Sequence, residues 1–201
     1  MDKPIQIIVK PDWVSWDDIH NVLVQAHAVN RTKGINMRKP SLPGEEIKKE
    51  IGDDGIMLVA LDGDKVVGSA ALLVKENTTW YNNGPYGYLC FAAVLPEYNG
   101  MGIYKCLCEK REKIARERGV EKLCFDTHHL NKHVIEINET KGFKKVDVKL
   151  LHDHWNVVLF KWMEGCPYNS IKCVFEFYIR VAKMLLIKTI KSNHGCHNCR
   201  R

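Results

Sequence analysis

The stretch Val94-Leu95-Pro96-Glu97-Tyr98-Asn99-Gly100-Met101-Gly102-Ile103-Tyr104-Lys105 decides the fold. An apolar strand ends here in a glycine-rich turn, and a helix begins directly after it. Glycine lets the backbone approach a ligand closely, and the first N–H groups of a helix have no acceptor within the helix and carry partial positive charge. The stretch therefore predicts an anion site suited to phosphate, although two alternate glycines are by themselves equally typical of an ordinary helix-capping turn.

The residues that follow give a specific order of elements. An amphipathic helical pattern begins at Ile103 and closes at Arg118-Gly119, and the apolar run 123–125 predicts a buried strand. A second helical pattern runs from Asn131 to Gly142, and Phe143 begins another strand. The order is thus strand, glycine turn, helix, strand, helix and strand.

This order resembles the GNAT superfamily of acyl-CoA-dependent N-acyltransferases over residues 56–160. The pyrophosphate loop of that family reads Arg or Gln, x, x, Gly, x, Gly or Ala. Asn99 stands at its first position and Tyr104 at its last, so that Gly102 is the strict match. The resemblance implies an α/β (α+β) fold, with a mostly antiparallel sheet of six to seven strands that splays centrally and is flanked by helices.

The resemblance also implies a cofactor site for acetyl-CoA, bound as a co-substrate. Its loop would be formed by Asn99, Gly100, Met101, Gly102, Ile103, Tyr104 and Lys105, and a free backbone N–H among Ala93, Val94 and Leu95 would hold the thioester carbonyl. Asn131 and Asn138 would face the cofactor from the second helix. Asn138 takes the register of a tyrosine that protonates the departing thiolate in many members, and an amide cannot do this. A branch of the superfamily carries the same asparagine.

No strong general base is evident on the strand before the loop, since residues 88–95 contain neither Asp nor Glu. His128, at the end of the neighbouring strand, is the first catalytic candidate, because histidine accepts a proton near neutral pH. Its rival interpretation is a solvent-exposed or hydrogen-bonded loop histidine. Tyr88 acting through an ordered water is the second catalytic candidate. Neighbouring strand residues face opposite ways, so we expect only one of His128 and His129 to reach the site.

The N-terminal half predicts the first layers of the fold. Residues 5–9 form a strand, and Ser15 is the candidate N-cap of a helix that begins at Trp16. Strands over 56–61 and 65–74 flank a turn and form a hairpin. Residues 75–87 are polar with three aromatics and predict a loop, whose aromatics either form a binding wall or cap the sheet edge.

Composition predicts a globular protein of 201 residues, of which 45% are hydrophobic and 27% charged. The chain shows no membrane-spanning run and no signal peptide, so we expect a cytoplasmic protein with reduced cysteines and no membrane contact. The formal charge of +6 suits a phosphate-rich cofactor, and without a nucleic-acid motif we expect no specific nucleic-acid binding. We expect no metal site. The pair His152 and His154 lacks further ligands, and the pair Cys196 and Cys199, which has two histidines beside it, is half a zinc site and equally typical of a mobile tail or a redox-sensitive thiol pair.

The C-terminal region leaves the family pattern. We expect a domain over 1–164 and an amphipathic, basic helix with a Cys/His tail over 165–201. The helix is expected to pack on the domain, with pairing of two subunits and contact with an anionic membrane as alternatives.

The predicted function is transfer of an acetyl group from acetyl-CoA to a primary amine, by direct attack of the amine. The acceptor is expected to be a small molecule rather than a protein. The alternative is a non-catalytic acyl-CoA sensor or an interaction module that acts through the C-terminal helix.

Overall fold

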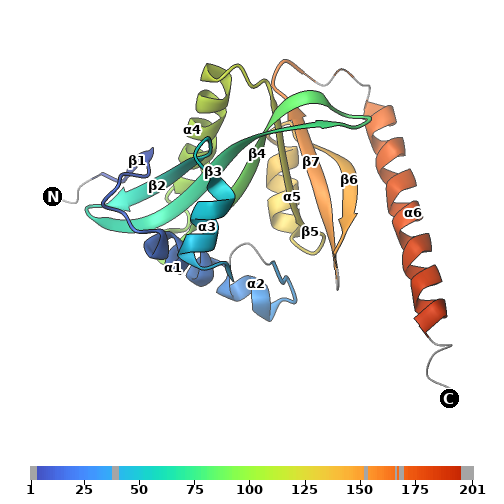
Figure 1. The fold of residues 1–201 in the computed structure, drawn as a ribbon, viewed down its shortest axis with the longest axis horizontal. Helices are drawn as coiled ribbons and strands as arrows, with labels where there is room; N and C mark the ends of the chain where they lie inside the picture. Colours follow the sequence, from blue (N-terminus) through green and yellow to red (C-terminus); the bar gives the residue numbers. More distant parts are fainter. Residues whose placement is uncertain (1–3, 38–40, 152–153, 166, 168–169, 196–201) are drawn as a thin grey trace. The chain divides into compact units, whose positions relative to one another are not determined.

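The structure is a computed structural model that describes residues 4–37, 41–151, 154–165, 167 and 170–195. Figure 1 shows its elements, which in chain order are β1 (Gln6–Val9), α1 (Trp16–Ala26), α2 (Ala28–Thr32), α3 (Gly44–Ile51), β2 (Ile56–Asp62), β3 (Lys65–Thr78), β4 (Asn83–Val94), the 3₁₀ turn η2 (Pro96–Tyr98), α4 (Ile103–Glu117), β5 (Lys122–His128), α5 (Lys132–Glu139), β6 (Lys144–Leu150), β7 (Trp155–Trp162) and α6 (Ser170–Gly195). No helix among these described residues has the length and apolar character needed to cross a membrane.

The strands form one seven-stranded sheet in the order β1-β2-β3-β4-β5-β7-β6. The pairs β1–β2, β2–β3, β3–β4 and β6–β7 are antiparallel, and β4–β5 is parallel. This confirms the predicted mostly antiparallel sheet. The chain divides into two compact units, Met1–Phe125 and Asp126–Arg201.

The first unit begins as the sequence predicts. Ser15 caps α1 with a capping box, in which its Oγ accepts the Asp18 N–H and the Asp18 carboxylate accepts the Ser15 N–H, both at 3.0 Å. The apolar face of α1 is buried, and β2 is buried over almost its whole length. Apolar burial of this kind supplies most of the stability of the unit.

The predicted polar loop over 75–87 is wrong, because β3 and β4 extend through most of it. The two strands pair out to Thr78 and Asn83 and are joined by a tight turn in which the Thr79 N–H donates to the Asn82 carbonyl at 2.7 Å. Tyr81 and Tyr86 are buried rather than exposed. Asn and Gly suggested a loop, but backbone pairing along the hairpin outweighs these weak local preferences.

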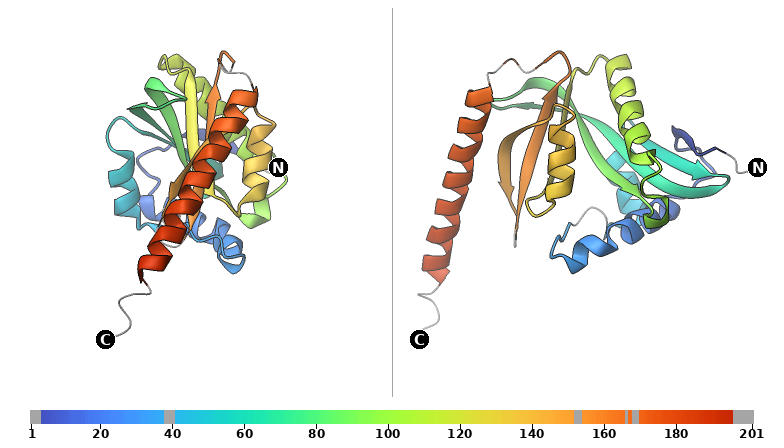
Figure 2. Two further views of the ribbon diagram at one scale, coloured as in Figure 1. Left: turned by 90° about the vertical axis from the view of Figure 1, so that its right-hand side faces the viewer. Right: turned by 180° about the vertical axis from the view of Figure 1, so that it is seen from behind.

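The second unit contains β7 and β6, at one end of the sheet, and the last two helices. α5 ends at Glu139, before the predicted stop at Gly142, whose φ of +90° then turns the chain into β6. α6 packs against β6, as Figures 1 and 2 show. Phe177 and Met184 are buried on α6, and Arg180 pairs with Asp147 of β6 at 3.3 Å.

Candidate active site

A β-bulge in β4 shapes the strand that precedes the glycine loop. Ser69 pairs with Ala93 and Ala71 with Cys90, so β4 holds one residue more than β3 between these pairs. Phe91 lies in this interval with φ +50°, and it is the one non-glycine residue with positive φ among those described. The fully buried Ser69 donates its hydroxyl to the Phe91 carbonyl at 2.9 Å and so holds the bulge in place.

Beyond the bulge, one edge of β4 has no strand partner in the described ladder. Its parallel pairing with β5 covers only Gly87 with Leu123 and Tyr88 with Cys124. Leu95 uses its N–H toward β3, donating to the Val67 carbonyl at 2.9 Å. Because successive N–H groups along a strand point to opposite edges, the N–H of Val94 points to the open edge. Of the three residues predicted to hold a carbonyl, the geometry therefore favours Val94.

The glycine loop has the backbone geometry of an anion cradle. Gly100 and Gly102 have φ of +82° and +76°, and Gly102 is the N-cap of α4 without a side-chain cap bond. An added Cβ at either glycine would meet no atom within 4 Å, so the left-handed backbone rather than crowding requires glycine. The first helical bond runs from Cys106 N–H to Gly102 O at 3.1 Å, so α4 offers no acceptor to the N–H groups of its first turn.

The β2–β3 hairpin holds in place the short 3₁₀ turn η2 that precedes this loop. The Tyr98 hydroxyl donates to Asp62 at 2.8 Å, and Lys65 pairs with Glu97 at 3.2 Å. The bond to the Asp62 carboxylate raises the pKa of Tyr98, because ionisation of the phenol would remove the donated proton. The hairpin thus fixes η2, from which the glycine loop departs.

His27, which sequence reasoning missed, contacts the same strand. It lies between α1 and α2, where its Nδ1 lies 2.8 Å from the side-chain nitrogen of Asn30. The backbone of Ala92 lies near the ring and favours its protonated form. Burial lowers the pKa of His27 and Arg31 lowers it further, against the opposing effect of the Ala92 backbone, so the net shift favours the neutral ring.

The position of Ala92 places His27 near the open edge of β4. Ala92 lies two residues before Val94, and residues two apart on a strand direct their backbone groups to the same edge, about 7 Å from each other. His27 therefore lies beside β4, at the edge to which the Val94 N–H points. No motif marks His27 in the sequence, since its partner lies 65 residues further along the chain.

Tyr88, the second catalytic candidate, lies at the end of the short parallel ladder. It is buried, with 8% of its surface exposed, and the Lys75 ammonium lies 4.4 Å from the centre of its ring. A cation over the ring face stabilises this position of both side chains.

His128 belongs to the second unit and is buried, with 2% of its surface exposed. Its Nδ1 accepts the Leu130 N–H at 3.1 Å, so the ring is hydrogen-bonded and buried at the end of β5 rather than exposed to solvent. The ring stacks on His129 at 4.6 Å and on His154 at 4.5 Å, and His129 stacks on Trp155. The expectation that His128 and His129 face opposite ways is also wrong, because β5 ends at His128 and His129 lies in the turn.

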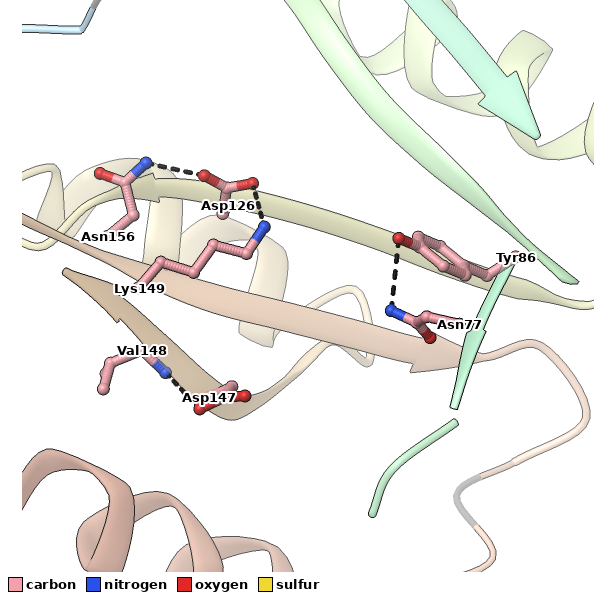
Figure 3. A network of polar contacts seen from close by, with 7 residues as sticks. All are labelled: Asn77, Tyr86, Asp126, Asp147, Val148, Lys149 and Asn156. Atoms are coloured by element: carbon pink, nitrogen blue, oxygen red, sulfur yellow. Dashed lines mark hydrogen bonds and ion pairs between the residues drawn. The ribbon is translucent and has the colours of Figure 1, made fainter. Parts of the chain in front are cut away.

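The two predicted asparagines make contacts within the second unit. Asn131 donates to the Thr127 hydroxyl at 3.0 Å, and Asn138 donates to the Val134 carbonyl of its own helix at 2.8 Å. Asp126, just before this segment, accepts bonds from Lys149 at 3.1 Å and Asn156 at 2.7 Å, as Figure 3 shows. These bonds order the end of β5 and the start of α5.

Some of the residues considered as metal ligands in the sequence are not described by the structure. His152, Cys196 and Cys199 lie outside the described residues. Within the part of the chain that the structure describes, no three His, Cys, Asp or Glu side chains are grouped as metal ligands.

The sequence model of the acetyltransferase (GNAT) family matches residues 16–143. A sequence comparison with curated proteins gives no match.

Three solved acetyltransferase structures illustrate the fold similarity. An acetyltransferase of Streptococcus agalactiae superposes with a TM-score of 0.61 at 20% identity, covering 79% of this chain and 98% of its own. A GNAT acetyltransferase of Elizabethkingia anophelis with acetyl-CoA bound gives 0.56 at 14% identity, covering 79% and 97%. The ribosomal-protein-S18-alanine N-acetyltransferase of Escherichia coli gives 0.59 at 15% identity, covering 83% and 98%.

Proposed function

Because the chain belongs to the acetyltransferase (GNAT) family, we propose that it transfers an acetyl group from acetyl-CoA to a primary amine by direct attack. The observation that carries this proposal is the cradle at Gly100–Lys105, which directly follows the open edge of β4. Acetyl-CoA would supply an activated thioester there.

The cradle suits a pyrophosphate. The first-turn N–H groups of α4 and the positive end of its dipole attract anions, and the positive φ of Gly100 and Gly102 shapes the turn before them. Asn99 is extended and places a shorter, neutral amide where the family pattern has Arg or Gln, so backbone N–H groups carry more of the binding.

The open edge of β4 would polarise the acyl group. The Val94 N–H is positioned to donate a hydrogen bond to a carbonyl oxygen, and such a bond strengthens as negative charge develops on that oxygen. Asn131 and Asn138 remain proposed cofactor contacts. His128 and Tyr88 remain proposed proton carriers.

The acceptor that we propose is a small-molecule amine, as the sequence predicts. A direct attack requires the amine to be neutral, with its proton leaving as the new N–C bond forms. No residue between Gly87 and Pro96 supplies a carboxylate for this proton. A histidine rather than an acidic side chain is therefore the proposed route.

Calorimetric titration with acetyl-CoA tests the proposal, with Gly102→Asp as the disabling variant. We expect the parent to bind and Gly102→Asp to lose at least about 100-fold in affinity, because a carboxylate would oppose the phosphates. The matched control is Gly119→Asp, which places the same side chain at a positive-φ glycine, φ +69°, after the last residues of the same helix.

The control should bind acetyl-CoA like the parent. Turnover is then measured as chromatographic release of CoA with a panel of amines. Failure of the parent to bind acetyl-CoA, or equal losses in both aspartate variants, would contradict the proposed site.

A further inference from the structure

α6 carries an exposed apolar surface, which we call the α6 stripe. Its six large members have exposed fractions between 52% and 79%: Ile171, Val174, Phe175, Tyr178, Leu185 and Leu186. Each member lies three or four residues from another along the helix, except across the gap between Tyr178 and Leu185, where Ala182 lies on the same side. Residues at this spacing share one face of a helix. Contiguous exposed apolar surface of this kind marks an interaction site.

The α6 stripe is separate from the face through which α6 packs against the rest of the protein. Cys173, Phe177 and Met184 are buried, and the helix packs on β6. On a helix at 100° per residue these three lie on a different side from the stripe. A helix that only packed on the domain would need one apolar side, so the second side calls for a second apolar environment.

The charge of the chain is concentrated in the same segment. Residues 165–201 hold seven of the 30 Lys and Arg and one of the 24 Asp and Glu, so they carry a formal charge of +6 while residues 1–164 are net neutral. The seven are Lys172, Arg180, Lys183, Lys188, Lys191, Arg200 and Arg201. Lys172 and Lys183 are exposed, and each lies three residues before a stripe member, Phe175 and Leu186.

This charge distinguishes between two possible partners of the α6 stripe, a second copy of α6 and a lipid surface. Pairing two copies of α6 would bring two segments of charge +6 together, and like charges oppose association. An anionic lipid surface accepts both features, since acyl chains take the apolar side chains and headgroups take the lysines.

We propose that α6 lies on anionic membranes, with the α6 stripe at the acyl boundary and Lys172 and Lys183 at the headgroups. From the sequence alone, membrane contact of this helix was an alternative to packing on the domain, because the sequence did not show which side of the helix packing uses. The proposal is independent of the acetyl-transfer reaction.

Vesicle co-sedimentation of the full-length protein tests the proposal. The vesicles are phosphatidylcholine alone or phosphatidylcholine with phosphatidylglycerol as about a third of the lipid, a fraction chosen to give a negative surface potential. We expect the parent to bind only the anionic vesicles, and less as salt rises. Phe175→Ser/Leu186→Ser should weaken binding at least about tenfold. Lys172→Glu/Lys183→Glu should weaken it by at least about 25-fold.

The matched controls make the same kinds of substitution, apolar to serine and lysine to glutamate, at exposed positions outside α6. Trp13→Ser/Val74→Ser removes two apolar side chains that are 59% and 44% exposed, and Lys48→Glu/Lys113→Glu reverses two exposed lysines on other helices. Both controls should bind like the parent, and circular dichroism should show all variants folded. Three results would overturn the proposal: no binding by the parent, equal binding to neutral vesicles, or a stable parent dimer that Phe175→Ser/Leu186→Ser dissociates without any vesicle binding.

Discussion

At the scale of single residues, His27 links the N-terminal helices to the strand that carries the proposed carbonyl donor. The ring bonds Asn30 and lies near the Ala92 backbone, and its pKa is lowered chiefly by burial. A neutral ring with Nδ1 accepting from Asn30 carries its proton on Nε2, which is then able to donate to the Ala92 carbonyl. We interpret His27 as a positioning residue, which acts on Val94 through the backbone of β4.

Two substitutions separate this role from that of a proton carrier. Gln places an amide N–H near the position of Nε2, so His27→Gln should keep kcat near that of the parent. His27→Leu leaves the Ala92 carbonyl without this donor and should lower kcat about tenfold to 100-fold, with a smaller change in KM for acetyl-CoA. Steady-state kinetics and the amide chemical shift of Val94 are the measurements.

The control for His27 is His20, which lies in α1, the helix that ends just before His27. His20 Nδ1 bonds the Leu42 carbonyl at 2.7 Å, and His20→Asn should change neither kcat nor the Val94 shift. Equal loss of kcat in His27→Gln and His27→Leu would show that the ring carries a proton instead. An unmoved Val94 shift in His27→Leu would contradict the positioning role whether or not the enzyme turns over.

The lowered pKa of His27 also predicts a pH dependence of stability. The unfolded chain binds a proton at His27 at a higher pH than the folded chain does, so stability falls as the pH drops below the ordinary pKa of histidine. The decline contributed by this residue ends below the lowered pKa. Urea unfolding of the parent and of His27→Gln across this range should give a shallower acid slope for the variant, and identical slopes would refute the assignment.

At the scale of elements, the contact between β4 and β5 depends on a glycine. A Cβ at Gly87 would lie 2.8 Å from Leu72 Cδ1 and 2.9 Å from Leu123 Cδ2, closer than side chains pack. The parallel ladder of β4 and β5 begins at this residue and ends one residue later. Gly87 therefore lets the two strands meet before β4 continues along its open edge.

Gly87→Ala should lower the free energy of unfolding by about 1–3 kcal/mol through overpacking, as measured by urea denaturation. Leu123→Val removes the Cδ atoms on one side of the contact at a cost of about 1 kcal/mol. The double variant should then lose less stability than the two single losses together. If the two losses in the free energy of unfolding simply add in the double variant, the loss in Gly87→Ala does not come from its contact with Leu123.

At the scale of the whole molecule, the anion cradle and the α6 stripe lie in different compact units and use different residues. One is built from backbone N–H groups and glycine, the other from apolar side chains and lysines. We therefore expect the two properties to be separable.

Phe175→Ser/Leu186→Ser should bind acetyl-CoA like the parent in calorimetry, because sites without shared residues rarely couple. Gly102→Asp should likewise bind anionic vesicles like the parent. Loss of both properties in either variant would mean that the substitution unfolds the protein or that the two surfaces are energetically coupled.

The sequence by itself determined the local features of the protein. The Ser15 capping box, the positive-φ glycines around α4 and the order of the strands and helices follow from turn chemistry, capping and periodicity, all of which act over a few residues.

Only the tertiary structure decided the features that depend on partners distant in the chain. The bulge at Phe91 needs Ser69, the lowered pKa of His27 needs burial of its ring beside Ala92, and the hairpin over 75–87 needs its two strands to pair. The stack of His128 on His154 and the exposure of the α6 stripe likewise follow from how separate segments pack. Such contacts leave no periodic signal, because side chains that meet in space are set by packing rather than by spacing along the chain.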